Sequence, residues 1–242
     1  AQAGGTVDRQ SILDEIQWSE EFARRTGLEH ALELAALRQI RTTILATEAK
    51  ESARPNPELP AGVAARWSFE GEPAAAGIEA SGRCRSGAGV FGRGLLLDGT
   101  SVLAVPGAGG FAGAPYTVAG WLKSASQEAD LLGNGTARGS VLLMSYRGVA
   151  RAHHWTTGGL TMVDGTTRID DGDWHHLAQC SDGKELRLYV DGKLEASAPL
   201  RGALCASEAP VHLGWRGGER RSSRLVGALD EQRPVAGDAA VA

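Results

Sequence analysis

Two pairs of adjacent histidines are the first candidates for chemistry in this chain, His153-His154 and His175-His176. An imidazole ring can ligate a metal or transfer a proton near neutral pH. Adjacent residues of a β-strand, however, point to opposite faces of the sheet. Neither pair can therefore chelate one ion by itself if the strands that we expect around them form.

A histidine and a tryptophan form the second candidate. If the stretch from Val149 to Thr156 is a strand, His153 and Trp155 share one of its faces. Together they could line a sugar-stacking surface through aromatic and polar contacts, and we predict them as ligand-binding residues. The alternative is that Trp155 is an ordinary side chain of the core or rim.

A cluster of arginines lies in one loop that contains Gly and Ser, before the last predicted strand. Its members are Arg216, Arg220, Arg221 and Arg224. Such a loop could bind sulfate, carboxylate or an acidic protein surface, so we add these residues to the ligand-binding candidates. The alternative is a solvated hairpin.

The sequence gives little support for a motif of a common enzyme class. The stretch from Gly87 to Gly92 matches G-x-G-x-x-G by spacing, but a dinucleotide-binding motif must follow a strand and open a helix. Here we expect a loop before it and the strand Leu95 to Leu97 after it. The nucleophile motif G-x-S-x-G is absent. The acidic run from Asp170 to Asp173 contains the glycine of a turn and is interpreted as a solvated loop.

Two shorter features stay open at this point. Cys84, Cys180 and Cys205 form no CxxC motif, and they are either three free thiols or one pair, Cys180 with Cys205, and a free thiol. Asn134-Gly135-Thr136 is a formal glycosylation sequon, but Asn-Gly is equally typical of a turn.

Composition restricts the class of protein. The 242 residues, 42% of them apolar, suffice for one large all-β domain with an appendage. A formal charge of −4 provides no field that would attract nucleic acid, and we predict no nucleic-acid partner. No apolar run approaches the roughly 18 to 20 residues of a membrane span. The first residues include neither an initiator Met nor a signal sequence, and we expect the chain to be processed or excised.

The N-terminal quarter differs from the rest. Residues 11–25 and 28–51 are rich in helix-forming residues and contain no Gly or Pro, which predicts a two-helix segment within residues 1–51. Three prolines in residues 52–60 predict a semi-rigid linker. We therefore expect a β domain over residues 61–235 and a short tail over residues 236–242.

Short apolar runs separated by Gly-rich turns follow the linker. The stretch from Asp173 to Gly192 contains two alternating runs around Asp182-Gly183, which is a strong hairpin signal. A further turn at Asp191-Gly192 predicts a third strand and thus an antiparallel meander. Many short antiparallel strands favour a two-sheet sandwich or jelly roll.

In this order the strands resemble those of the laminin-G-like members of the concanavalin A-like lectin/glucanase superfamily. The matching stretches are Trp67 to Gly71, Gly92 to Gly99, Tyr116 to Lys123, Asp173 to Gly192 and Gly227 to Val235. Pro234 interrupts the last of them, where the family has a regular strand. The resemblance covers about residues 61 to 235 and implies a mainly β fold, a two-sheet antiparallel jelly-roll sandwich with the N-terminal α-helical segment outside it.

The resemblance also implies what to expect of the site. Glycanases of this superfamily place their carboxylates on a Glu-x-Asp-x-Glu strand, which this chain lacks, so we predict that it is not an enzyme. His175 and His176 belong to the structural pattern of the family. Many members hold a structural calcium, and the resemblance places it beside Asp230, with Glu70 or Asp98 supplying further oxygens. The alternative is that these carboxylates cap turns or face water. No other cofactor is predicted.

Two functions follow as hypotheses. The first is a non-catalytic recognition module that binds a glycan or a protein partner within a larger extracytoplasmic protein or assembly, be it periplasmic, secreted or surface-exposed. The second is a structural subunit that docks into a multiprotein complex through its N-terminal helices, whose apolar stripe needs a partner surface.

Overall fold

The computed structural model describes residues 66–71, 73, 77–106, 108–135, 138–215 and 224–236, all within a unit that spans Arg54–Ala242. The predicted helices, the linker, and Arg216, Arg220 and Arg221 lie outside these residues, as does the predicted tail apart from Ala236. No helix in the described part of the chain is long and apolar enough to cross a membrane.

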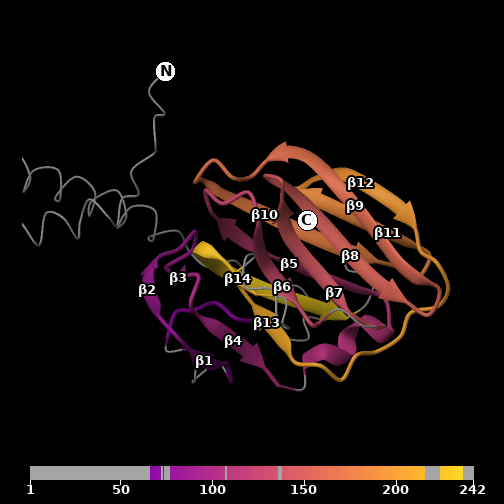
Figure 1. Ribbon diagram of the computed structural model, residues 1–242, viewed down its shortest axis with the longest axis horizontal. Coiled ribbons are helices and arrows are strands. Elements are labelled where there is room, and N and C mark those ends of the chain that lie inside the picture. The colour runs from indigo at the N-terminus through magenta and orange to yellow at the C-terminus, as the bar shows by residue number, and fades with distance from the viewer. Residues whose placement is uncertain are drawn as a thin grey trace, which may run out of the picture. The chain divides into compact units, whose positions relative to one another are not determined.

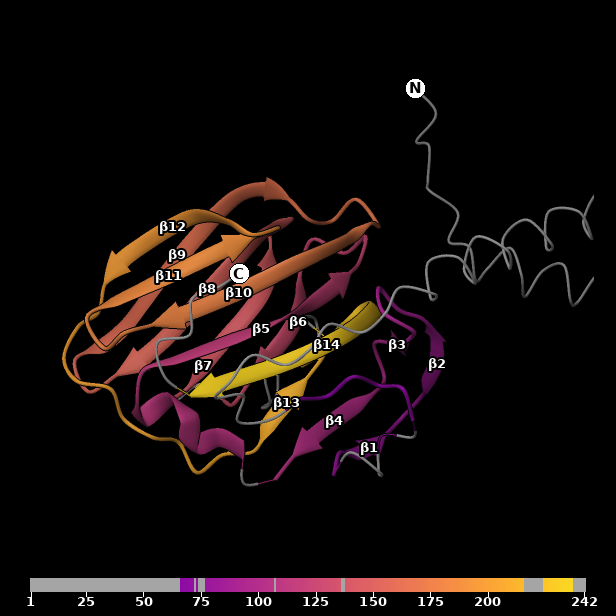
Figure 2. The ribbon, with the colours of Figure 1, turned by 180° about the vertical axis from the view of Figure 1, so that it is seen from behind.

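Two antiparallel sheets of seven strands each build the domain, as predicted (Figures 1 and 2). One sheet, here the β8 sheet, has the order β1-β4-β13-β6-β7-β8-β9, and the other, the β5 sheet, has the order β12-β11-β10-β5-β14-β3-β2. The elements are β1 Glu79–Ser81, β2 Cys84–Ala88, β3 Arg93–Asp98, β4 Val102–Val105, the 3-10 helix η2 Ala108–Gly113, β5 Tyr116–Lys123, β6 Ala129–Gly133, β7 Val141–Tyr146, β8 Val149–Thr156, β9 Gly159–Arg168, β10 Trp174–Ser181, β11 Glu185–Val190, β12 Lys193–Pro199, β13 Val211–Leu213 and β14 Val226–Ala236.

The predicted meander is formed by β10, β11 and β12, which lie side by side in Figure 2. Asp182 closes its first turn, because one carboxylate oxygen accepts hydrogen bonds from the backbone N–H of Lys184 at 2.8 Å and of Glu185 at 2.9 Å. Gly183 adopts a φ of 88°, a conformation that favours glycine. The Asp-Gly signal of the sequence therefore marks a real hairpin.

Alternation along the strands fills the core between the sheets. In β11 the side chains of Leu186, Leu188 and Val190 are buried, whereas the intervening residues are half-buried. The same inward positions in other strands supply Leu122, Leu143 and Leu177, each fully buried. Each sheet therefore presents one apolar face to the other, as the period of two in the sequence predicts.

A buried polar group links the two sheets, which the sequence did not predict. The amide Nε2 of Gln179 in β10 donates hydrogen bonds to the Tyr116 hydroxyl at 2.7 Å and to the backbone carbonyl of His153 in β8 at 2.8 Å. The Tyr116 hydroxyl lies 3.3 Å from Nδ1 of His154. Because Tyr116 accepts from Gln179, its own proton can be donated to Nδ1, and His154 is then neutral with its hydrogen on Nε2.

Protonation of His154 should be costly. Burial lowers the pKa of His154 to about 4, and no residue in the described ranges offers Nε2 a hydrogen-bond partner. His154 is also inaccessible to solvent. The unfolded chain therefore binds a proton at this residue at a higher pH than the folded chain does.

We expect this residue to make the domain sensitive to acid. As the pH falls from 6.5 towards 4, the free energy of unfolding should decrease by about 3 kcal/mol through His154. The variant His154→Gln cannot titrate and should lose less stability over this interval. Urea denaturation of both proteins at about pH 6.5 and about pH 4 measures the difference. An identical pH dependence in the two proteins would contradict the assignment.

Candidate ligand-binding face

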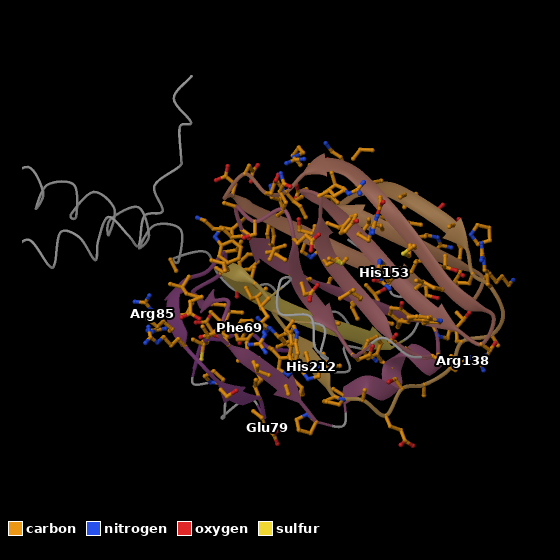
Figure 3. All side chains as sticks on the ribbon, viewed as in Figure 1. Phe69, Glu79, Arg85, Arg138, His153 and His212 are labelled. Atoms are coloured by element: carbon orange, nitrogen blue, oxygen red, sulfur yellow. The ribbon has the colours of Figure 1, made fainter. Side chains whose placement is uncertain are left out.

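The predicted strand with the histidine and the tryptophan is β8, and its residues alternate between the core and the outside. Ala152 and His154 are buried between the sheets, whereas Arg151, His153 and Trp155 are half-buried on the outward face. His153 and Trp155 thus share one face, as the sequence predicted. His153 is labelled in Figure 3 among the side chains of the β8 sheet.

Strand β9 extends this face by its register. Trp155 pairs with Leu160, His153 with Met162 and Arg151 with Asp164. Residues directly opposite each other in an antiparallel pair point to the same side of the sheet. We call the six side chains the β8–β9 face: Arg151, His153, Trp155, Leu160, Met162 and Asp164. Met162 is 50% exposed, which is unusual for a methionine, and makes the face accessible.

An ion pair of fixed geometry lies at one end of this face. Nε and Nη2 of Arg151 donate to the two carboxylate oxygens of Asp164, the second bond at 2.6 Å. The guanidinium carbon lies 3.7 Å from the centre of the Tyr146 ring. The hydrogen bond raises the pKa of Arg151 and lowers the pKa of Asp164, so both groups are charged at neutral pH.

Sequence reasoning missed these residues. The strand period around His153 could have indicated Arg151, two residues earlier on the same face. Asp164 could not be found in this way, because it lies on another strand and only the register brings it opposite Arg151. In the sequence, Asp164-Gly165 is an Asp-Gly pair and so predicts a turn, whereas the structure places both residues within β9.

Of the four predicted arginines, only Arg224 is described. Its guanidinium carbon lies 4.8 Å from the centre of the Trp215 ring, and Nη1 donates to the carbonyl of Thr100 at 3.4 Å. Trp215 in turn contacts His212 edge to face, with ring centres 5.0 Å apart. Arg224 is thus held against an aromatic pair beside β13 in the β8 sheet.

The β8–β9 face and the Arg224 cluster are separate. His212 pairs with Gly133, Gly133 with Leu142, and Leu142 with His153, so three strand spacings of about 4.8 Å separate the two histidines. Leu142, between them, is only 4% exposed. Figure 3 labels His153 and His212 on different parts of the sheet. Of the predicted ligand-binding residues, the described ones, His153 and Trp155 on one side and Arg224 on the other, therefore lie at separate places on the sheet.

The three carboxylates predicted to hold calcium take part in backbone hydrogen bonds. Buried Asp230 accepts from the N–H of Val90 at 2.8 Å and of Phe91 at 2.9 Å, in the turn between β2 and β3. Glu70 accepts from Arg93 at the end of the same turn, at 3.2 Å.

Asp98 is at the far end of β3, where it accepts from the N–H of Thr100 at 2.9 Å. Within the described ranges, no three His, Cys, Asp or Glu side chains come together as a metal site. Asp98 therefore does not join Glu70 and Asp230 in one cluster, and a calcium ion beside Asp230 stays a prediction.

We expect calcium to leave the melting temperature of this domain unchanged, since binding would require Glu70 and Asp230 to exchange backbone donors for the ion. Thermal melts with excess chelator and with excess Ca²⁺ test this expectation. A higher melting temperature with Ca²⁺ would contradict it, and the variant Asp98→Asn would then show whether the exposed carboxylate contributes.

His175 and His176 lie in structural contacts, in agreement with their interpretation from sequence. Nδ1 of His175 lies 2.9 Å from Asp191, and Nε2 lies 3.2 Å from Asp171, so the ring connects the β9–β10 loop to the β11–β12 turn. The ring of His176 packs on Trp121, with ring centres 5.1 Å apart. Burial opposes protonation of His175, but the hydrogen bonds to Asp191 and Asp171 outweigh it and raise the pKa.

The variant Asp191→Asn should lower the pKa of His175, because a neutral amide replaces the carboxylate that stabilises the imidazolium. In the wild type, the contact between Asp191 and protonated His175 makes its full contribution to stability below pH 6.5. This contribution is lost as the pH rises through the raised pKa of His175. NMR titration of the ring measures the shift. Asp173→Asn is the control, since Asp173 makes no hydrogen bond to the ring. An unchanged titration in Asp191→Asn would count against the contact.

The open features of the sequence are also settled by geometry. The stretch from Gly87 to Gly92 covers the end of β2 and the turn into β3, so a strand does precede it, contrary to the prediction, but a strand and no helix follows. The three cysteines are free thiols. Asn134 is buried, and its side-chain oxygen accepts from Val141 N–H at 2.6 Å. The amide side chain of Asn134 is therefore engaged inside the fold.

Comparison with known proteins agrees with the fold. The chain belongs to the concanavalin A-like lectin/glucanase superfamily, since the model of its Laminin_G_3 family matches residues 97–234, more than half of the chain. No curated protein sequence is significantly similar.

Three solved structures are similar at low identity. The binding domain of Paraclostridial Mosquitocidal Protein 1 is 15% identical with a TM-score of 0.54, and the match covers 66% of this chain and 44% of that one. Domain 4 of AbnA, an extracellular GH43 arabinanase of Geobacillus stearothermophilus, in complex with arabinotriose, is 17% identical with a TM-score of 0.51, covering 72% and 92%. Domains LG4-5 of the mouse laminin alpha1 chain are 18% identical with a TM-score of 0.52, covering 62% and 41%. At these identities the likeness establishes the fold alone.

Proposed function

We propose that this chain is a non-catalytic recognition module that binds a glycan through the β8–β9 face. The observation that carries the proposal is the composition of that face. Rings and apolar side chains form one part of it, at His153, Trp155 and Met162, and an oriented Arg151–Asp164 pair forms the other.

This combination suits a sugar. A pyranose or furanose ring offers C–H groups that pack on aromatic and apolar side chains, and hydroxyl groups that need both donors and acceptors. Trp155 and His153 supply the first kind of contact. The guanidinium and the carboxylate supply the second kind. Because the face lies on two regular, hydrogen-bonded strands, its groups are held in place before a ligand arrives.

The electrostatics of the face argue against glycoside hydrolysis. A hydrolase needs two carboxyl groups on either side of the bond, one of them with a raised pKa to act as acid. The strand register identifies the outward-facing residues of β7, β8 and β9 next to the segment from Arg151 to Trp155. Among these described residues, Asp164 is the only carboxylate. Its pKa is lowered by Arg151, which is the wrong direction for an acid.

The setting of the module is proposed by analogy. Similar structures are described as a toxin binding domain, a domain of an extracellular arabinanase and laminin LG domains, which supports an extracytoplasmic module within a larger protein. The structural-subunit hypothesis depends on the N-terminal helices, which lie outside the described residues. No observation on the described domain favours it over recognition.

Replacing the tryptophan tests the proposal. Trp155→Ala should weaken glycan binding about tenfold or more, since a central aromatic contact commonly contributes more than 1 kcal/mol. The whole chain is first applied to a glycan array, and the oligosaccharide bound best is then titrated by calorimetry into wild type and variant.

Trp174→Ala is the matched control, because Trp174 is a half-buried tryptophan on the other sheet. It should bind as the wild type does. An array without any bound glycan, or equal affinity of Trp155→Ala and wild type, would overturn the proposal.

A further inference from the structure

The charges on the β8–β9 face restrict the class of glycan. Resting on the function proposed above, we propose that this face selects a neutral glycan with neighbouring hydroxyl groups, and that Arg151 and Asp164 are its specificity-determining residues. The two side chains pair through two parallel hydrogen bonds, so that the pair by itself presents a dipole and no net charge.

Two further cations lie near the pair. Arg168, on the same side of the sheet opposite Val149, is paired with Asp170. Arg147 lies with its guanidinium carbon 5.3 Å from the centre of the same Tyr146 ring, and its charge also lowers the pKa of Asp164, so one positive charge remains near the Arg151 end of the face. An anionic sugar placed on Arg151 would have the Asp164 carboxylate within hydrogen-bond distance of the same guanidinium, and the two negative charges would repel each other.

The same pair has hydrogen-bonding capacity that fits a diol. Bonding to Asp164 uses Nε and Nη2 of Arg151, and Tyr146 makes a further hydrogen bond to the guanidinium, which together leave other N–H donors of this group for a ligand. Each carboxylate oxygen of Asp164 accepts one of these bonds, although it can accept more, and the side chain is 47% exposed. One sugar hydroxyl can therefore accept from the guanidinium while its neighbour donates to the carboxylate.

The apolar row beside the pair orients the sugar. His153 lies two residues along β8 from Arg151, and Met162 lies two residues along β9 from Asp164. A ring that reaches the pair with two hydroxyls places its C–H groups over these side chains. Tyr146 is covered by the Arg151 guanidinium and therefore fixes the arginine, instead of stacking on the sugar itself.

Binding of three oligosaccharide classes tests the inference: neutral, uronic-acid-containing and sulfated, each titrated by calorimetry at low and high NaCl. Neutral oligosaccharides should bind best, with a Kd that changes less than about twofold between about 0.05 M and 0.5 M NaCl, because neither the sugar nor the Arg151–Asp164 pair that contacts it carries a net charge. Asp164→Asn and Arg151→Gln should each weaken neutral binding about tenfold. Asp164→Asn, which leaves Arg151 uncompensated, should also gain affinity for the acidic class.

Arg187→Gln is the matched control, because Arg187 is also paired with carboxylates, Asp182 and Glu185, but lies on the other sheet. It should not alter binding. Preference for acidic glycans with strong salt dependence, or neutral binding that survives both variants of the pair, would overturn this inference and leave the proposed function standing. If no glycan binds, or if Trp155→Ala binds every class as the wild type does, the proposed function itself fails.

Discussion

A buried hydrogen-bond network connects the two layers of this domain at the strand that carries the candidate site. Gln179 belongs to the β5 sheet, yet its Nε2 donates to the carbonyl of His153 in the β8 sheet and to the Tyr116 hydroxyl, which lies beside His154. Buried hydrogen bonds of this kind are costly to leave unmade, so they fix how β8 sits above the core. The outward side chains of β8 are therefore positioned by contacts on its inward side.

Several acidic residues of this domain accept hydrogen bonds from backbone N–H groups at turns. Asp182 closes the β10–β11 hairpin, Asp230 holds the β2–β3 turn and Asp98 caps the turn after β3. A carboxylate that accepts backbone N–H groups satisfies donors that the strands leave unpaired at their ends. In this domain most of the carboxylates that attract attention in the sequence serve turns, whereas Asp164, which the sequence did not distinguish, lies on the accessible face opposite an arginine.

Much of the fold could be predicted because its signals are local. Alternation in β11, the Asp-Gly turn at Asp182 and the boundaries of β8 all depend on residues close together in the chain, and the structure agrees with them. The outward placement of His153 and Trp155 follows from the same period of two. Their relation to Arg224 could not be predicted in this way, since it depends on the order of β13, β6 and β7 between them.

The sequence by itself determined that this chain forms an antiparallel β-sandwich of the concanavalin A-like superfamily, with His153 and Trp155 on one strand face, because side-chain direction along a strand is fixed by the pleat. Tertiary structure alone decided three further things. It placed Asp98 at the other end of β3 from the turn that Glu70 and Asp230 bind, it buried His154 beside Tyr116, and it set Asp164 opposite Arg151. Each of these depends on which distant strands pair and in which register, and a period within one strand carries no information about its neighbour.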